Sequence, residues 1–414
     1  MIGEDLSMSS GPSVARPVLD AGGWPIASRM RIGFVMEQVL GHVTWYRNLR
    51  GAVTDLGSID ARWVETRLFD PNGVIEKIPG IPPYARAGVR GLLDVRRGLR
   101  GWPCDVLVFN TQKPAIFCQW QTSRTPTMLL TDVTPIQYDR MACLYDHQVD
   151  ENPVVRIAKH QANVLNFRLA AALVPCSTWA ADSMIRDYGM PPEKVHVIPI
   201  GLDTKRWCPR APRQMPDRVR LLFVGGHFER KGGRLLLEVF HSLGLHDRAE
   251  LHVVTRDAVE PVPGLVVHRG LENDSAELLQ LYQSADAFVL PTLADCFSNA
   301  SLEAMAVGLP VITTAVGGIP DIVEHRKTGY LLAAGHRRDL AAALLRVVDN
   351  APLRAMMGAA GRQRAVRRFD ARTQAAKILQ LAHVLVEKPY ASPLIDRGLW
   401  SSRSPSSRAH STEV

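Results

Sequence analysis

The segment between residues 287 and 314 constrains the fold of this chain more than any other part of the sequence. Residues 287–290 form a short apolar run that ends at Pro291, and residues 311–314 form a second run. Two such runs around a helical segment predict a parallel βαβ unit, because parallel strands need a crossover connection. Strand and helix patterns alternate in both halves of the chain. We therefore predict an α/β protein of two doubly wound domains, with a ligand cleft at the carboxyl ends of their strands.

Between these two strands lies a predicted helix whose only charged residue is Glu303. Residues 300–307 are apolar on nearly every side, which is typical of a buried helix, and Ser298 or Asn299 can cap it. A buried carboxylate needs a hydrogen-bonding partner. A capping box would require a capping residue at position 300, which is alanine. A ligand hydroxyl is the favoured partner, and an exposed helix edge is the alternative.

A predicted anion site follows the strand at residues 218–224. Gly225 and Gly226 come directly after this strand, and Arg230 and Lys231 precede the next helix. Glycines let the backbone approach an anion, and a helix amino end favours negative charge. The glycine spacing is not that of a Rossmann fingerprint, and no Ser or Thr follows the lysine as a P-loop requires. The alternative is ordinary solvated charge.

The first half of the chain also has polar residues at the ends of its predicted strands. The strand at residues 31–36 leads into a loop with Glu37, Gly41 and His42, which suits a ligand at the end of that strand. An ordinary satisfied loop is an equal alternative. Asp132 follows another buried strand, and it either faces the same cleft or caps the Thr-Pro turn after it.

The stretch around Glu303 resembles the signature of the retaining glycosyltransferases of family 4, which have the two-domain GT-B fold. In that family a Glu, seven residues and a second Glu precede Ala-Met-Ala, with Phe-Gly two places after the first Glu. Here Asp295, seven residues and Glu303 precede Ala-Met-Ala, and Phe297 is in place. Asp295 replaces the first Glu, and Ser298 replaces the Gly.

The glycine-rich loops also resemble landmarks of that family. Its second landmark is Gly-Arg, four residues and Lys-Gly, in which the cations hold the donor diphosphate. Lys231 matches the lysine, but Gly226 stands where the arginine would be, and Arg230 is a neighbouring substitute. The loop with Gly41 resembles the turn opposite the diphosphate, where the family often has two glycines.

The resemblance implies a role for each residue. Lys231, Arg230 and the loop amides would stabilise the leaving diphosphate, while Glu303 would bind ribose hydroxyls and Asp295 a donor-sugar hydroxyl. The shorter Asp295 would mark an altered donor choice. The candidate catalytic residues are Lys231, Arg230, Asp295 and Glu303. The candidate donor-binding residues are Gly225, Gly226, His227, Lys231, Arg256, Leu271, Phe297, Ser298, Asn299 and Glu303. The candidate acceptor-side residues are Glu37, Gly41, His42 and Asp132.

The implied activity is a glycosyl transfer that retains the anomeric configuration and needs no metal. The implied enzyme class is a hexosyltransferase. The donor is a nucleotide-sugar, which is a co-substrate rather than a cofactor, and the acceptor is a glycan, a lipid or a small molecule. No Asp-x-Asp motif or His cluster indicates a metal site. Because positions 226, 295 and 298 depart from the family pattern, two alternatives stay open: a non-catalytic binder of nucleotide-sugars or glycans, and a GT-B epimerase.

The domain prediction follows from the same patterns. We expect a disordered extension at residues 1–29, an acceptor-side Rossmann-like domain at 30–205, and a nucleotide-sugar-binding Rossmann-like domain at 217–370. A last helix at about 371–388 would cross back onto the first domain. Residues 392–414, rich in Ser and Arg, are predicted to be disordered.

The net charge of +8 favours an anionic partner. A nucleotide diphosphate fits the resemblance, and no nucleic acid is expected. Five arginines alternate with apolar residues at helical spacing between residues 86 and 100, so this helix either lies on an anionic membrane or presents a solvated face. Gly88, Gly91 and Gly98 argue against the helix itself. No run has the roughly 20 apolar residues of a membrane span, which predicts a cytoplasmic protein with membrane association as an option.

Overall fold

The computed structural model describes residues 29–387 apart from 40, 68, 71–72, 80–82 and 211–217. The predicted disordered tail, nearly all of the predicted extension and most of the linker before residue 217 lie outside the described residues. Within them, no helix combines the length and the apolar character that a membrane crossing needs.

The first half of the chain folds around a five-stranded sheet with the order β2-β1-β3-β4-β5, in which every pairing is parallel. We call this part the N-terminal lobe. Its strands are β1 (Arg31–Glu37), β2 (Asp60–Thr66), β3 (Val106–Phe109), β4 (Thr127–Thr131) and β5 (Ala172–Pro175). Its helices are α1 (Gly41–Leu56), α2 (Pro83–Gly98), α3 (Gln112–Ala115), α4 (Gln119–Thr122), α5 (Pro135–Arg140), α6 (Pro153–Leu169) and α7 (Thr178–Arg186), with short 3-10 turns η1 (Ile75–Lys77), η2 (Ala142–Leu144) and η3 (Pro192–Lys194).

The second half, the C-terminal lobe, is built on a six-stranded parallel sheet with the order β11-β10-β9-β6-β7-β8. Its strands are β6 (Val219–Val224), β7 (Ala249–Val254), β8 (Leu265–His268), β9 (Ala287–Leu290), β10 (Val311–Thr314) and β11 (Gly329–Leu332). Its helices are α8 (Gly233–Ser242), α9 (Ala276–Ser284), α10 (Asn299–Ala306), α11 (Ile319–Ile322), α12 (Arg337–Asp349) and α13 (Ala351–Phe369), with the turn η4 (Leu245–Asp247). The predicted class, two doubly wound parallel sheets, is confirmed.

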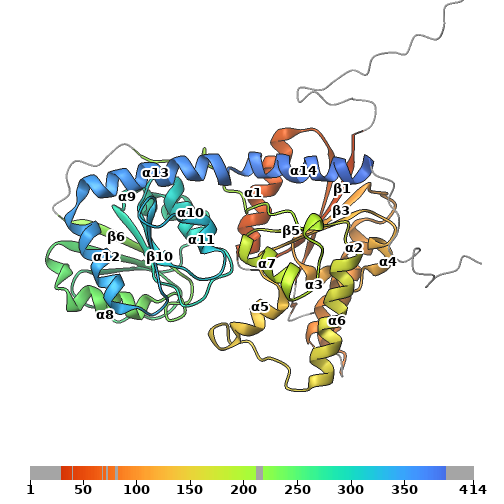
Figure 1. Ribbon diagram of the computed structural model, residues 1–414, viewed down its shortest axis with the longest axis horizontal. Coiled ribbons are helices and arrows are strands. Elements are labelled where there is room, and N and C mark those ends of the chain that lie inside the picture. Colours follow the sequence, from red (N-terminus) through yellow and green to blue (C-terminus); the bar gives the residue numbers. More distant parts are fainter. Residues whose placement is uncertain are drawn as a thin grey trace, which may run out of the picture.

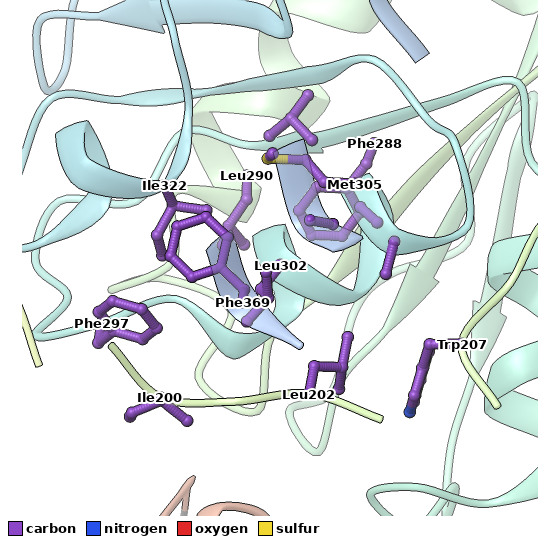
Figure 2. Packing of buried hydrophobic residues seen from close by; sticks show 14 of the residues in the cluster. Ile200, Leu202, Trp207, Phe288, Leu290, Phe297, Leu302, Met305, Ile322 and Phe369 are labelled. Atoms are coloured by element: carbon purple, nitrogen blue, oxygen red, sulfur yellow. The ribbon is translucent and has the colours of Figure 1, made fainter. Parts of the chain in front are cut away.

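The chain passes between the lobes twice, and the two crossings lie side by side. The Leu202 amide donates to the Phe369 carbonyl at 2.8 Å, and the Ala371 amide donates to the Leu202 carbonyl at 2.9 Å. Apolar side chains near both crossings, among them Ile200, Leu202, Trp207 and Phe369, pack with Leu302 and Met305 of α10 (Figure 2). After the second crossing, α14 (Ala371–Glu387) packs against α1, so that α13 and α14 together run along both lobes (Figure 1).

The glycines of α2 have a packing role that the sequence analysis missed. A Cβ at Gly91 would lie 2.6 Å from the Pro114 Cα, and a Cβ at Gly98 would lie 2.5 Å from a methyl group of Val64. At Gly88 the same atom would meet the Phe117 ring at 2.4 Å. The intrinsic helix preference of glycine is poor, but here its lack of a side chain lets α2 approach α3 and β2 closely. The objection to a helix at these residues was therefore wrong.

Candidate active site

The loop after β9 is held from both sides by glycine backbones. Gly232 has φ +77°, and a Cβ there would lie 2.0 Å from the Pro291 carbonyl oxygen. Gly317 has φ +55°, and a Cβ there would lie 1.8 Å from the Asp295 carbonyl oxygen. Only glycine combines this left-handed backbone with such close approach. The signature loop is thus fixed between the glycine-rich loop after β6 and the turn before α11.

Glu303 is buried in α10, with 7% of its surface exposed, so the exposed-edge alternative is wrong. Ser298 caps this helix by accepting a hydrogen bond from the Ser301 amide. Burial raises the pKa of Glu303 to about 8; a hydrogen bond with Tyr282 opposes the rise and the charge of Asp274 adds to it. Tyr282 is thus a partner of this carboxyl, and the predicted contact with ribose hydroxyls stays a prediction.

Lys231 and Asp295 form an ion pair with each other. The Lys231 Nζ lies 2.5 Å from Asp295 Oδ2, and both side chains are largely buried. Each residue was expected to contact the donor, one at the diphosphate and the other at the sugar. The pairing keeps two charges compensated in a poorly solvated place, because an unpartnered charge there would be costly. It also brings together the two predicted halves of the donor site.

Arg230 reaches from the glycine-rich loop towards the N-terminal lobe. Its guanidinium donates to the Ala294 carbonyl at 3.1 Å and lies 4.2 Å from the centre of the Tyr145 ring. The Tyr145 hydroxyl is 3.7 Å from the Cys296 sulfur. Burial, followed by the charges of Cys296 and Asp295, raises the pKa of Tyr145. Tyr145 and Cys296 were missed because nothing in the sequence connects a turn near residue 145 with the signature loop.

The arginine nearest to Gly226 is Arg256. A Cβ on Gly226 would lie 3.9 Å from the Arg256 Nε, and the Arg256 side chain is exposed. Arg230, the substitute expected from the sequence, instead contacts Ala294 and Tyr145. Arg256 was one of the candidate donor-binding residues, and the structure places it beside Gly226, the position where the family pattern has its arginine.

The other predicted donor-binding residues differ in how far their side chains are exposed to solvent. His227 is exposed, whereas Leu271 is partly buried and packs against the core. Phe297 is buried near Phe369, as Figure 2 shows, and the Ser298 side chain is used as the cap of α10. The side chains of Phe297 and Ser298 therefore serve the fold, and the contact of their backbone amides with a ligand stays a prediction.

On the opposite side, His42 lies between two carboxylates. Its Nδ1 is 3.4 Å from Glu37 Oε2, and its Nε2 is 3.3 Å from Asp132 Oδ2. Burial alone would lower the pKa of His42, but the negative charges of Asp132 and Glu37 outweigh it and raise the pKa to about 10. Asp132 is not a cap, because Thr134 caps α5 in a capping box with Gln137.

Two polar contacts join the lobes beside the site. The Asn299 Nδ2 donates to the Gly41 carbonyl at 3.4 Å. A second bridge joins Thr178 of α7 to Asp321: the amide donates to Oδ2 at 2.5 Å and the hydroxyl to Oδ1 at 2.7 Å. This contact joins α7 of the N-terminal lobe to α11 of the C-terminal lobe, and the sequence analysis did not predict it. Within the described part of the chain, no group of three His, Cys, Asp or Glu side chains could hold a metal.

Solved structures with this arrangement define the class. Sucrose-phosphate synthase from Thermosynechococcus elongatus aligns over 86% of this chain and 99% of that one, with a TM-score of 0.67 and 17% identity. Anabaena HepE, solved in complex with UDP and glucose, aligns over 86% and 100%, with a TM-score of 0.59 and 15% identity. At such identities the likeness concerns the fold alone. Two facing parallel sheets joined by a double crossing make this a GT-B protein.

Sequence comparison supplies the family. The model for Glycosyltransferase Family 4 matches residues 59–206, and the model for Glycosyl transferases group 1 matches residues 218–350. The MMP alpha-(1->4)-mannosyltransferase of Mycolicibacterium hassiacum is 29% identical over 215 residues, which are 50% of this chain and 52% of that protein. The matched region thus spans about half the length of this curated relative. The chain belongs to the family 4 glycosyltransferases.

Proposed function

We propose that this protein is a retaining glycosyltransferase that moves a hexose from a nucleotide-sugar to a hydroxyl of a glycan, lipid or small-molecule acceptor without a metal. The observation that carries the proposal is the juxtaposition of two charged sets across one cleft. The Lys231–Asp295 pair and Glu303 lie on the C-terminal lobe, and the Glu37–His42–Asp132 set lies on the N-terminal lobe. The Asn299 contact with Gly41 joins the two sides.

The donor side would work by electrostatic stabilisation. The diphosphate gains charge as the sugar carbon becomes cationic, so fixed cations and backbone amides lower the barrier. Lys231 is held rigidly by Asp295, which reduces the reorganisation needed when the phosphate arrives. The structurally similar Anabaena protein was solved with UDP and glucose, which supports a nucleotide-sugar as donor.

The acceptor side would contribute an ionised carboxylate held by His42, rather than a neutral histidine base. With a pKa raised to about 10, the His42 imidazole is protonated at neutral pH, because Asp132 and Glu37 stabilise the charged form. A protonated imidazole has no free lone pair to take a proton from the acceptor. Because both ring nitrogens face carboxylates, the imidazolium would instead hold Asp132 and Glu37 in their ionised form, and Asp132 would accept a hydrogen bond from an acceptor hydroxyl.

The test is to incubate the full chain with a panel of nucleotide-sugars and candidate acceptors and to measure released nucleoside diphosphate. We expect release with at least one pair, retention of the anomeric configuration by NMR, and no loss in EDTA. Lys231→Ala and Glu303→Gln should abolish release, while Lys327→Ala, at a lysine with 70% of its side chain exposed, should not. Donor binding without turnover in any mixture would support the non-catalytic binder, and sugar interconversion without acceptor would support the epimerase.

A further inference from the structure

The amino-terminal half of α6 stands free of the rest of the N-terminal lobe. Residues 153–158 are all exposed, whereas the carboxyl-terminal half is anchored through Val164 and Phe167, which are buried in the lobe. Figure 1 shows the first part of α6 extending beyond the strands of the lobe. Val154 is 72% exposed and Ile157 is 62% exposed. Large apolar side chains that lie together in the open mark an interaction surface.

The exposed side of α6 has the spacing of a coiled-coil seam. Exposed residues recur there at intervals of three and four, namely Glu151, Val154, Ala158, Gln161, Leu165 and Arg168. Residues spaced in this way lie along one side of a helix and form the contact line between two paired helices. We call these six residues the seam. An acid stands just before the helix at one end of the seam, and a base stands near the end of the helix at the other.

The seam is complementary to a second copy of itself in the antiparallel orientation. When two such helices pair about the midpoint between positions 158 and 161, Glu151 of each copy meets Arg168 of the other. In the same register Val154 meets Leu165 of the other copy. Glu151 and Arg168 form no ion pair with any other residue in the described part of the chain, so both charges are available. A parallel pair would oppose each charge with itself.

The side chains that border the seam are apolar as well. In the antiparallel pair Val155 lies next to Ala162 of the other copy, and Ile157 lies next to Val164 of the other copy. Arg156 projects from the opposite side of the helix, because each residue turns by about 100°. The charges of the paired helices therefore lie at the two ends of the contact, and apolar side chains lie between them.

We propose that α6 pairs with α6 of a second copy in the antiparallel orientation, so that the protein forms a two-fold symmetric dimer. A two-fold axis brings one surface against itself, and the opposite charges at the two ends of the seam are what such an axis requires. A lipid surface would cover the apolar side chains but would leave the acid at one end without a partner. The proposal goes beyond glycosyl transfer and does not depend on it.

The size of the contact sets its strength. α6 has 17 residues, and a helix of this length is about 25 Å long. One helix pair of this length is at the small end of specific interfaces. We therefore expect a dimer that dissociates on dilution, with a dissociation constant on the order of micromolar.

The dimer would act on the active site through the segment that leads into α6. This segment carries Tyr145, whose ring centre lies 4.2 Å from the Arg230 guanidinium and whose hydroxyl is 3.7 Å from the Cys296 sulfur. A partner that covers the free half of α6 would restrain this segment and hold Tyr145 against the signature loop.

The test is sedimentation velocity of the full chain over concentrations from about 1 to about 100 µM. Glu151→Arg and Arg168→Glu, each alone, place like charges together at both ends of the pair and should weaken dimerisation by about tenfold. The double variant Glu151→Arg/Arg168→Glu should restore it, because every contact then joins opposite charges again. This double variant has the same net charge as the natural protein, and a parallel pair would not be restored by it.

The apolar contact needs its own variant pair. Val154→Ser/Ile157→Ser should leave the chain monomeric, while Met356→Ser/Val366→Ser, at exposed apolar positions of α13, should leave the dimer unchanged. Circular dichroism should show all variants folded, because these side chains are exposed. A natural protein that stays monomeric at the highest concentration would overturn the proposal and leave the seam to a partner of another kind. Equal loss in the two apolar variants, or charge reversals whose combination does not restore the dimer, would overturn it as well.

Discussion

The buried carboxyl of Glu303 should make the stability of this protein fall as pH rises. Its pKa is raised from 4.5 to about 8, so the folded state favours the neutral form. Below about pH 4.5 both the folded and unfolded chains hold the proton, and no penalty exists. Between about 4.5 and 8 the unfolded chain releases it and the folded chain does not, so the free energy of unfolding falls with pH. Replacement by glutamine removes this dependence.

The size of the effect follows from the two pKa values. Relative to low pH, the free energy of unfolding is lower by about 1.4 kcal/mol at pH ~5.5 and by about 4.6 kcal/mol at pH ~8.5. The free energy of unfolding therefore falls by about 3 kcal/mol between these two pH values. The stability of Glu303→Gln relative to the natural protein should rise by this amount across the range. An effect of about 3 kcal/mol is a large share of the stability of an ordinary domain.

The assay is urea unfolding of both proteins at several pH values in this range. Glu324→Gln is the matched control, because Lys327 and Arg364 lower the pKa of Glu324 and its contribution is lost only as pH falls through that lowered value. The difference in unfolding free energy between Glu324→Gln and the natural protein should therefore stay constant across the range. If the difference in unfolding free energy between Glu303→Gln and the natural protein also stays constant, burial does not raise the pKa of Glu303 and the prediction is refuted. Nucleotide binding through an ionised Glu303 should reduce the dependence.

Three further predictions concern packing, the anion loop and the inter-lobe contact. Gly91→Ala should destabilise the protein by about 1–3 kcal/mol through overpacking, whereas Gly51→Ala, with open space around it, should be neutral or stabilise by up to ~1 kcal/mol in thermal unfolding. Gly226→Arg should leave the fold intact and tighten nucleoside diphosphate binding by on the order of tenfold in calorimetry, and weaker binding would count against the anion site. Asp321→Ala should open the lobes and increase the radius of gyration in X-ray scattering, more than Thr178→Val, which keeps the backbone hydrogen bond.

Local sequence patterns predicted the elements that depend on local physics. The βαβ unit around Glu303 followed from two apolar runs and an apolar helix, and burial of that carboxylate followed from the same pattern. The sequence also placed Glu37, His42 and Asp132 at strand ends of one sheet. Because parallel strands share an edge, these residues meet in the structure. Their catalytic roles stay a prediction.

What escaped prediction depends on contacts between distant segments. The three glycines of α2 counted against a helix on propensity, and only the approach of α3 and β2 explains them. The Tyr145–Cys296 contact joins residues 151 positions apart in the chain. Tertiary packing, rather than any local signal, determined each of these.

The departures of this chain from the family pattern are linked through charge. Three cations, Arg230, Lys231 and Arg256, lie on or beside the glycine-rich loop. Lys231 is neutralised by Asp295 at 2.5 Å, and Arg230 is held by a carbonyl and the Tyr145 ring. Under the proposed function, a diphosphate at the loop would meet Arg256 as an exposed cation and would have to share Lys231 with Asp295. Gly226 lacks a positive charge and Asp295 has a shorter side chain than the family's glutamate, and both changes affect the charge balance around Lys231. We therefore expect substitutions at the two positions to affect donor choice together.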